Sequence, residues 1–165
     1  MSMIGNLLRV SNTELQEYLK DSSLLEDRIY REDAEQDAGL VDIDKSWEGI
    51  LFLLTGQSLA EADHPLAAVL FSGQIVDENQ DLGYGPAHYV TPEQVSEINA
   101  QISKISFADL EQKFDPAKMM ELGIYPEIWD EDDEAIDYLS ENYNLIRDIY
   151  EKAAANGEAI ITFIN

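Results

Sequence analysis

Apolar residues recur at spacings of three and four along several stretches of this chain, which is the period that predicts amphipathic helices. The longest such stretch covers residues 130–156, and Gly157 follows it as a helix-ending glycine. Residues 47–55 are apolar on nearly every side, so we expect a buried central helix there, capped by Ser46 and ended by Gly56. Shorter helices are predicted at residues 12–20, 24–31, 65–71, 91–102, 106–114 and 116–122, with capping-box sequences at Ser11 and Thr91.

Strand-like runs stand at both ends of the sequence. Residues 3–10 are largely apolar with little helical periodicity, and residues 159–164 are rich in β-branched side chains. Short extended segments are predicted at residues 40–44, 73–76 and 87–90. Strands and helices in this order indicate an α+β fold. We therefore expect a helix-rich single domain, residues 1–165, packed on a small mixed sheet that includes the N- and C-terminal strands.

The charge balance restricts the partners of this protein. The chain has 34 aspartates and glutamates against 10 lysines and arginines, which gives a formal net charge of −24. Nucleic acids and anionic membranes are bound through lysine and arginine, so neither is an expected partner.

The absence of cysteine excludes disulfides and thiolate chemistry. The first residues do not form a signal-peptide pattern and the apolar runs are too short to span a membrane, so we expect a cytoplasmic protein.

Two stretches concentrate the negative charge. No lysine or arginine lies between Lys45 and Lys104, an interval that contains eight acidic residues. The second stretch is a run of five acidic residues at the start of the last predicted helix: Asp130, Glu131, Asp132, Asp133 and Glu134. Negative charge near a helix N-terminus stabilises it by about 0.3–1 kcal/mol per group, but five neighbouring charges repel one another and exceed that need. The run is therefore either a solubilising surface or a surface that binds cationic partners.

Few residues in the sequence indicate a catalytic, metal-binding or ligand-binding site. No nucleophile motif, metal-binding histidine pair or phosphate-binding glycine loop is present, and the acidic run lacks the central glycine of a calcium loop. Asp42 and Asp44 are two residues apart on a predicted extended segment, which places both carboxylates on one side. A candidate cleft combines these carboxylates with aromatic residues and a histidine: Asp42, Asp44, Trp47, Tyr84, His88 and Tyr125. The alternative is structural, with Asp44 helping to cap the next helix, the aromatic residues in the core and His88 in a structural or exposed position.

Several short motifs occur in an order that resembles a known family. They are Met3-Ile-Gly5, Val41-Asp-Ile-Asp-Lys-Ser-Trp47, Phe52-Leu-Leu-Thr-Gly56, Gly83-Tyr-Gly-Pro86, Tyr89-Val-Thr-Pro-Glu-Gln-Val95 and Ile124-Tyr-Pro-Glu-Ile-Trp129. Their order and content resemble the YfbM-like proteins, a bacterial family classed as a domain of unknown function. The resemblance extends over nearly the whole chain. It implies a compact cytoplasmic α+β domain and supplies no activity, cofactor or catalytic residue.

Two main hypotheses of function follow. The first is a non-catalytic binding domain whose acidic surface at residues 130–134 meets a basic protein partner, for example in an immunity- or antitoxin-like role. The alternative is a small-molecule-binding protein or hydrolytic enzyme with a cleft near Asp42, Asp44, Trp47, Tyr84 and His88. A divalent-cation binder is a third interpretation of the acidic residues. The sequence predicts no cofactor or resident metal, leaves enzymatic activity open and gives no oligomeric state.

Overall fold

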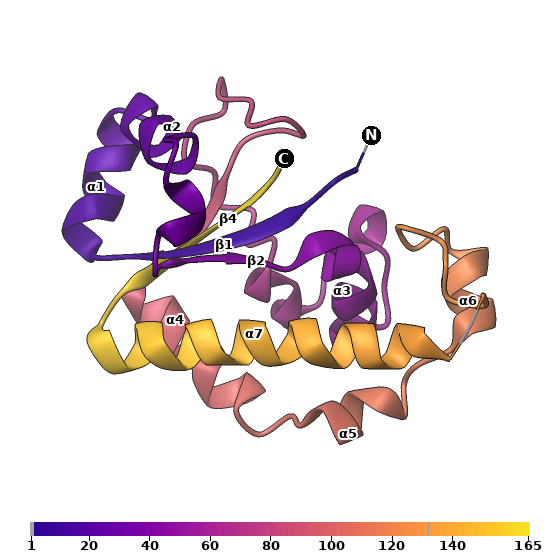
Figure 1. The fold of residues 1–165 in the computed structure, drawn as a ribbon. Helices are drawn as coiled ribbons and strands as arrows, with labels where there is room; N and C mark the ends of the chain where they lie inside the picture. Colours follow the sequence, from indigo (N-terminus) through magenta and orange to yellow (C-terminus); the bar gives the residue numbers. More distant parts are fainter. Residues whose placement is uncertain (1, 132) are drawn as a thin grey trace.

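A four-stranded sheet forms the centre of the computed structural model, which describes residues 2–131 and 133–165 (Figure 1). The strands lie in the order β2-β1-β4-β3: β1 (Gly5–Val10), β2 (Leu40–Asp42), β3 (His88–Val90) and β4 (Ala159–Ile164). β1 and β4 pair along their whole length, from Gly5 opposite Ile164 to Val10 opposite Ala159. The α+β fold and the pairing of the first and last strands are therefore confirmed. All three strand pairings are antiparallel, where a mixed sheet was expected.

Helices make up most of the remaining structure. They are α1 (Asn12–Lys20), α2 (Ser23–Ile29), α3 (Trp47–Thr55), α4 (Pro92–Ile102), α5 (Phe107–Glu111), α6 (Pro116–Glu121) and α7 (Glu134–Asn156). Two expected elements differ in type. The segment Pro65–Val69 is a 3-10 helix instead of an α-helix, and the expected strand at residues 73–76 is reduced to a single bridge between Ile75 and His88. Within the described residues, no helix is both long and apolar enough to cross a membrane.

The ends of the helices follow the local sequence closely. Ser11 and Thr91 form the expected capping boxes, and Gly56 and Gly157 end α3 and α7 with left-handed backbone conformations. Ser46 differs from its expected role. A 3-10 turn runs directly into α3, so the Ser46 hydroxyl donates to the carbonyl of Ile43 instead of capping the helix.

Helix α7 begins at Glu134, four residues later than expected, because the preceding turn buries Trp129. The Trp129 indole N–H donates to the carbonyl of Ile124, 2.8 Å away, which fixes the turn in a non-helical path. The indole ring lies beside Gly49 in α3. The acidic residues Asp130 and Glu131 therefore belong to an exposed turn and not to the helix.

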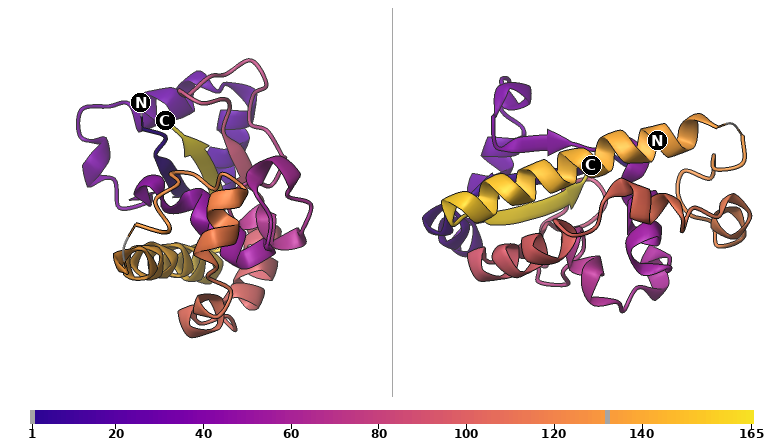
Figure 2. Two further views of the ribbon diagram at one scale, coloured as in Figure 1. Left: turned by 90° about the vertical axis from the view of Figure 1, so that its right-hand side faces the viewer. Right: turned by 90° about the horizontal axis from the view of Figure 1, so that it is seen from below.

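Both faces of the sheet are covered, so the molecule has three layers (Figures 1 and 2). Alternate residues of each strand point to opposite faces: Leu7 joins the core with α3, α4 and α7, whereas Leu8 joins the core with α1 and α2. Figure 2 shows α7 lying along one face of the sheet. Residues 72–87 form a long loop that contributes Val76 and Leu82 to the opposite face.

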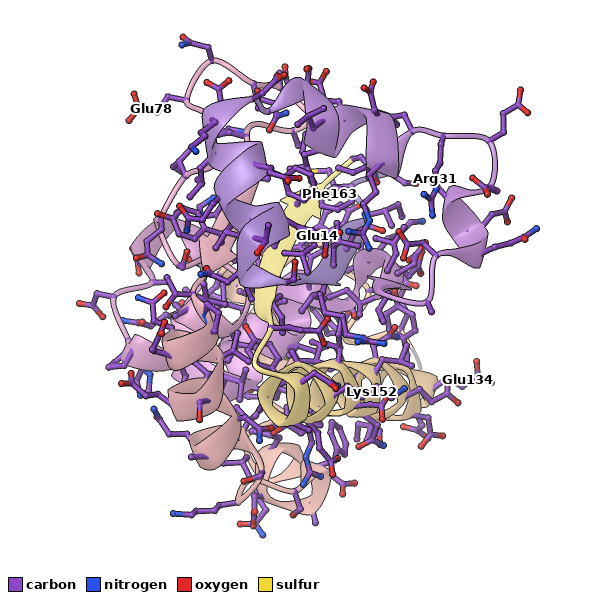
Figure 3. All side chains as sticks on the ribbon, turned by 90° about the vertical axis from the view of Figure 1, so that its left-hand side faces the viewer. Glu14, Arg31, Glu78, Glu134, Lys152 and Phe163 are labelled. Atoms are coloured by element: carbon purple, nitrogen blue, oxygen red, sulfur yellow. The ribbon has the colours of Figure 1, made fainter. Side chains whose placement is uncertain are left out.

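Acidic side chains project around the whole outline of the molecule, and Glu78 and Glu134 lie at opposite edges of one view (Figure 3). Phe163 of β4 lies in the interior in the same view, where it is 3% exposed. The negative charge is therefore spread over the surface as well as concentrated in the two stretches of the sequence.

Candidate functional site

A cavity of about 230 Å³ lies where the start of α3, the end of β4 and the 72–87 loop meet. Larger clefts, of about 500 and 560 Å³, are more open and are lined by several charged residues. The smaller cavity has mostly apolar walls, formed by Met3, Trp47, Leu59, Phe71, Tyr84, Pro86, His88, Phe163 and Ile164. Ligand sites are typically concave, apolar and aromatic, with a few polar groups that fix orientation, so this aromatic cavity is the candidate site.

Trp47 is the central wall of the aromatic cavity. It is the first residue of α3, and its indole N–H donates to the carbonyl of Met3 at 2.9 Å. The ring of Tyr125 stacks on Trp47 with centroids 5.4 Å apart, and the Tyr125 hydroxyl accepts a hydrogen bond from the N–H of Met3 at 3.0 Å. Phe71 meets Trp47 edge-on at 5.7 Å. These contacts hold three aromatic rings and the residues before β1 in one arrangement.

Glu48 fixes two further segments around the cavity. Its carboxylate is buried and accepts hydrogen bonds from the backbone N–H of Tyr125, at 2.8 Å, and of Leu59, at 3.0 Å. Leu59 lines the cavity, and Tyr125 supports its central wall. A single side chain on α3 therefore positions two loops that are more than sixty residues apart in the sequence.

Tyr84 stands at the mouth of the cavity and is 39% exposed. Its loop is held by Asp81, whose Oδ1 accepts hydrogen bonds from the N–H groups of Gly83 and Gly85 at 2.9 and 3.1 Å. These N–H groups stabilise the carboxylate and lower the pKa of Asp81. Gly83 has φ +127°, and a Cβ there would lie 3.1 Å from the Asn165 Cα, so the loop requires glycine at this close approach.

His88 is a titratable residue of the cavity wall. It begins β3, and its Nδ1 accepts a hydrogen bond from the N–H of Gly73 at 3.1 Å. The ring meets Phe71 edge-on, with centroids 5.7 Å apart. Burial lowers the pKa of His88, because the charged form loses hydration. The imidazole is therefore neutral near pH 7.

Asp42 and Asp44 do not line the aromatic cavity, and both are exposed. Asp42 accepts a hydrogen bond from the N–H of Asp44 at 2.7 Å, and Asp44 accepts one from the Tyr138 hydroxyl of α7 at 2.7 Å. The same hydroxyl accepts from the N–H of Lys45 at 2.8 Å. Burial and the Asp44 carboxylate raise the pKa of Tyr138. The two aspartates thus connect the turn before α3 to α7.

The residues of the acidic run lie elsewhere on the surface. Asp130, Glu131 and Asp133 are exposed and line a groove of about 560 Å³ together with Phe114, Pro116, Trp129 and Ile136. Glu134 is the first residue of α7, and Asp132 lies outside the described residues. Among the described residues, no group of three or more histidines, aspartates or glutamates is placed to hold a metal ion.

The structure therefore brings together part of the expected cleft. Trp47, Tyr84 and His88 line one cavity, with Tyr125 behind Trp47. The other lining residues were not predicted, because their meeting depends on strand pairing and on the path of the 72–87 loop. The structural role of Glu48 could have been predicted from the sequence, since it is the single carboxylate in an otherwise apolar helix and needs hydrogen-bond partners if it is buried. The lining residues are mostly apolar and aromatic, which is typical of the walls of a ligand-binding site.

Comparison with known proteins gives the family of this chain. A family model described as a domain of unknown function, DUF1877, matches residues 1–163. The chain belongs to the DUF1877 family. The crystal structure of YfbM from Escherichia coli, described as a protein of unknown function, shares the fold of this DUF1877 chain with a TM-score of 0.76. The match covers 98% of this chain and 99% of YfbM at 16% sequence identity, so it shows the fold alone.

The YfbM-like resemblance found in the sequence motifs is thus confirmed for this DUF1877 protein. A search of curated proteins gives no match.

Proposed function

We propose that this DUF1877 protein binds a small, mainly apolar molecule in the aromatic cavity beside Trp47. The observation that supports this role is a pre-arranged set of aromatic walls, each held by contacts that do not depend on a ligand. Pre-arranged walls reduce the ordering cost of binding. The proposal keeps the expectation that residues 1–165 form one domain working in the cytoplasm.

The size of the cavity sets the size of the ligand. An apolar cavity of about 150 Å³ is large enough to hold benzene. At about 230 Å³, the aromatic cavity has room for a molecule of one ring with substituents or two small fused rings. Burying a group the size of a Phe or Leu side chain contributes roughly 1.5–3 kcal/mol, before the cost of association. Fragments of this size are therefore expected to bind weakly and to need a sensitive assay.

The two tryptophans supply such an assay, because only one of them lines the cavity. A ligand in the cavity is expected to shift the indole N–H signal of Trp47 in a ¹H–¹⁵N NMR spectrum and to leave that of Trp129 in place. Trp129 is buried beside Gly49 and serves as the internal control. A panel of neutral one- and two-ring fragments that moves neither signal, or moves both equally, would contradict the proposed function.

A second candidate function is binding of a basic protein through the acidic groove, for example in an immunity- or antitoxin-like role. The observation that favours it is a groove with apolar residues, including Phe114 and Ile136, edged by the carboxylates of Asp130, Glu131 and Asp133. Apolar anchors surrounded by charge suit a partner with basic residues around an apolar contact.

Matched charge variants test this second candidate. The triple variant Asp130→Asn/Glu131→Gln/Asp133→Asn is compared with Glu17→Gln/Glu93→Gln/Glu97→Gln, which removes the same charge from exposed positions outside the groove. A basic protein captured from lysate at low salt should be lost from the first variant and retained by the second. Equal retention or equal loss would show that net charge, and not the groove, governs capture.

A further inference from the structure

We infer that the aromatic cavity selects a neutral ligand with a flat apolar body and one hydrogen-bond acceptor, and that the Nε2–H of His88 binds this acceptor. The inference rests on the proposed small-molecule role and adds the ligand class and the residue that recognises it. It follows from the hydrogen bonds already made within the walls and from the charge of the residues that line them.

The hydrogen bond between His88 and Gly73 fixes the tautomer of the imidazole. Nδ1 accepts from the Gly73 N–H at 3.1 Å, and a nitrogen that accepts a hydrogen bond carries no proton. The proton of the neutral ring is therefore on Nε2. Burial, which lowers the pKa of His88, keeps the ring in this neutral form. The edge-on contact with Phe71 and the pairing of His88 with Thr162 of β4 hold the imidazole in position.

The Nε2–H is a donor without a protein acceptor. Among residues 2–131 and 133–165, none forms a hydrogen bond with His88 Nε2. The indole N–H of Trp47, in contrast, already donates to the carbonyl of Met3. A donor in an apolar wall disfavours a ligand that covers it without an acceptor, because its hydration is lost and not replaced. His88 thus selects for a ligand with an acceptor at this wall.

The charge of the surroundings selects for a neutral ligand. Among the residues that the structure describes, no lysine, arginine, aspartate or glutamate lines the cavity, so a charged ligand would lose hydration without gaining an ion pair. An anion, which also offers acceptors, is further disfavoured by the formal net charge of −24. A neutral carbonyl compound meets both requirements.

Acetophenone and α-methylstyrene test this inference as a pair of probes. They have nearly the same shape, but the first has a carbonyl oxygen where the second has a methylene group. Binding is measured by titration of the Trp47 indole N–H signal in wild type and in His88→Asn. The asparagine oxygen can accept from the Gly73 N–H in place of Nδ1, whereas no donor remains at the position of Nε2.

We expect the preference for acetophenone over α-methylstyrene to fall by about three- to tenfold in His88→Asn, the effect of one net hydrogen bond. The affinity for α-methylstyrene should change little. His64→Asn is the matched control, because the Nδ1 of His64 also accepts from a backbone N–H, that of Leu66 at 3.0 Å, but His64 does not line the cavity. This control should keep the wild-type preference.

Other outcomes separate the inference from the proposed function. If both probes bind and the preference is the same in wild type and His88→Asn, the assignment to His88 is overturned while the binding role stands. The assignment is also overturned if Tyr84→Phe, which removes the hydroxyl group of a lining residue, abolishes the preference instead. If neither probe shifts the Trp47 signal, both the inference and the proposed function are overturned. Should His88→Asn lose its dispersed amide spectrum, His88→Leu, which also has no donor at the position of Nε2, replaces it and is judged by the same ratio.

Discussion

A buried carboxylate in the first turn of an apolar helix requires hydrogen-bond donors, because a buried charge without partners costs several kcal/mol. Glu48 finds two donors in loops that come from distant parts of the sequence, and one of those loops lines the aromatic cavity. The burial of this side chain therefore has a structural reason. It acts as a positioning residue for the cavity walls, since neither of its oxygens is needed for contact with a ligand.

Replacing Glu48 with glutamine tests this role. Glutamine keeps one acceptor oxygen, but its amide group would face the second backbone N–H, so one buried donor loses its partner. We expect Glu48→Gln to lower the free energy of unfolding by about 1–3 kcal/mol in a urea titration. Glu97→Gln, an exposed change of the same kind on α4, is the control and should have little effect. Equal stability of the two variants would show that the carboxylate does not hold the loops.

The partly buried imidazole of His88 predicts a pH dependence of stability. Its pKa in the folded protein is lower than the ordinary value of about 6.5, so between these two pH values the unfolded chain binds more protons. The stability that His88 contributes is therefore complete above about pH 6.5 and is lost as the pH falls through the folded pKa. No acidic, lysine or arginine side chain of the described residues lines the cavity to offset this effect.

Many carboxylates also titrate in acid and change the stability of both proteins. The contribution of His88 is therefore measured as the difference in the free energy of unfolding between wild type and His88→Asn. The stability advantage of wild type should shrink as the pH is lowered from about 7.5 to about 5.5. Urea titrations at several pH values measure it. A difference that stays constant or grows in acid would contradict a neutral, partly buried His88.

At the scale of elements, α3 and the turn that follows Tyr125 are packed without spare room. A Cβ on Gly49 would lie 2.6 Å from Trp129 Cη2 and 2.8 Å from Leu139 Cδ2, closer than real Cβ contacts. The absence of a side chain at position 49 therefore lets α7 and the Trp129 turn approach α3. This contact also explains the late start of α7.

Gly49→Ala sets two effects against each other. Alanine in place of glycine inside a helix is ordinarily stabilising by about 1 kcal/mol, whereas overpacking a core costs about 1–3 kcal/mol. Because both contacts involve well-packed side chains, we expect a net loss of about 1–2 kcal/mol in the free energy of unfolding. Ser96→Ala, at an exposed site on α4, is the control for a gain in helix propensity without overpacking, and it should stabilise the protein slightly. A stabilised Gly49→Ala protein would show that Trp129 and Leu139 can move aside.

The elements that the sequence predicted well are those whose ends are set locally. A capping serine or threonine and a terminal glycine act within a few residues, so α1, α4 and the end of α7 agree with their sequence patterns. The start of α7 was wrong because the burial of Trp129, a tertiary effect, outweighs the local preference of acidic residues for a helix N-terminus.

The same distinction applies to the candidate site. The sequence predicted Trp47, Tyr84 and His88 as cleft residues, because aromatic and histidine side chains often line binding sites. It did not predict Phe71 and Phe163, which also line the cavity. Their positions depend on how β4 enters the sheet and on how the segment before the long loop packs against α3. Asp42 and Asp44 were placed on one side of a strand, whereas β2 ends at Asp42 and Asp44 has φ +52° in a 3-10 turn.

At the scale of the whole molecule, the excess of acidic residues opposes folding. Like charges that are spread over a compact surface repel one another more than they do in an expanded chain. The described ion pairs relieve this repulsion at a few places, such as Arg28 with Glu14 and Asp37 and Arg9 with Glu158. The hydrogen bond from Arg28 lowers the pKa of Asp37, so this ion pair stabilises the charged carboxylate. Most of the acidic residues have no such partner, since the chain has 34 of them and 10 basic residues.

Salt should therefore stabilise this protein. The distance over which exposed charges interact falls from about 10 Å at 0.1 M ionic strength to about 3 Å at 1 M. We expect Tm to rise by about 3–8 °C between about 0.02 M and about 0.5 M NaCl, because repulsion is screened more strongly than the few short ion pairs are weakened. The variant Glu17→Gln/Glu93→Gln/Glu97→Gln carries three fewer negative charges, so it should be more stable at low salt and should respond less to added NaCl. A Tm that is independent of salt, or that falls as NaCl is added, would mean that favourable ion pairs and not net repulsion dominate the electrostatics of the folded state.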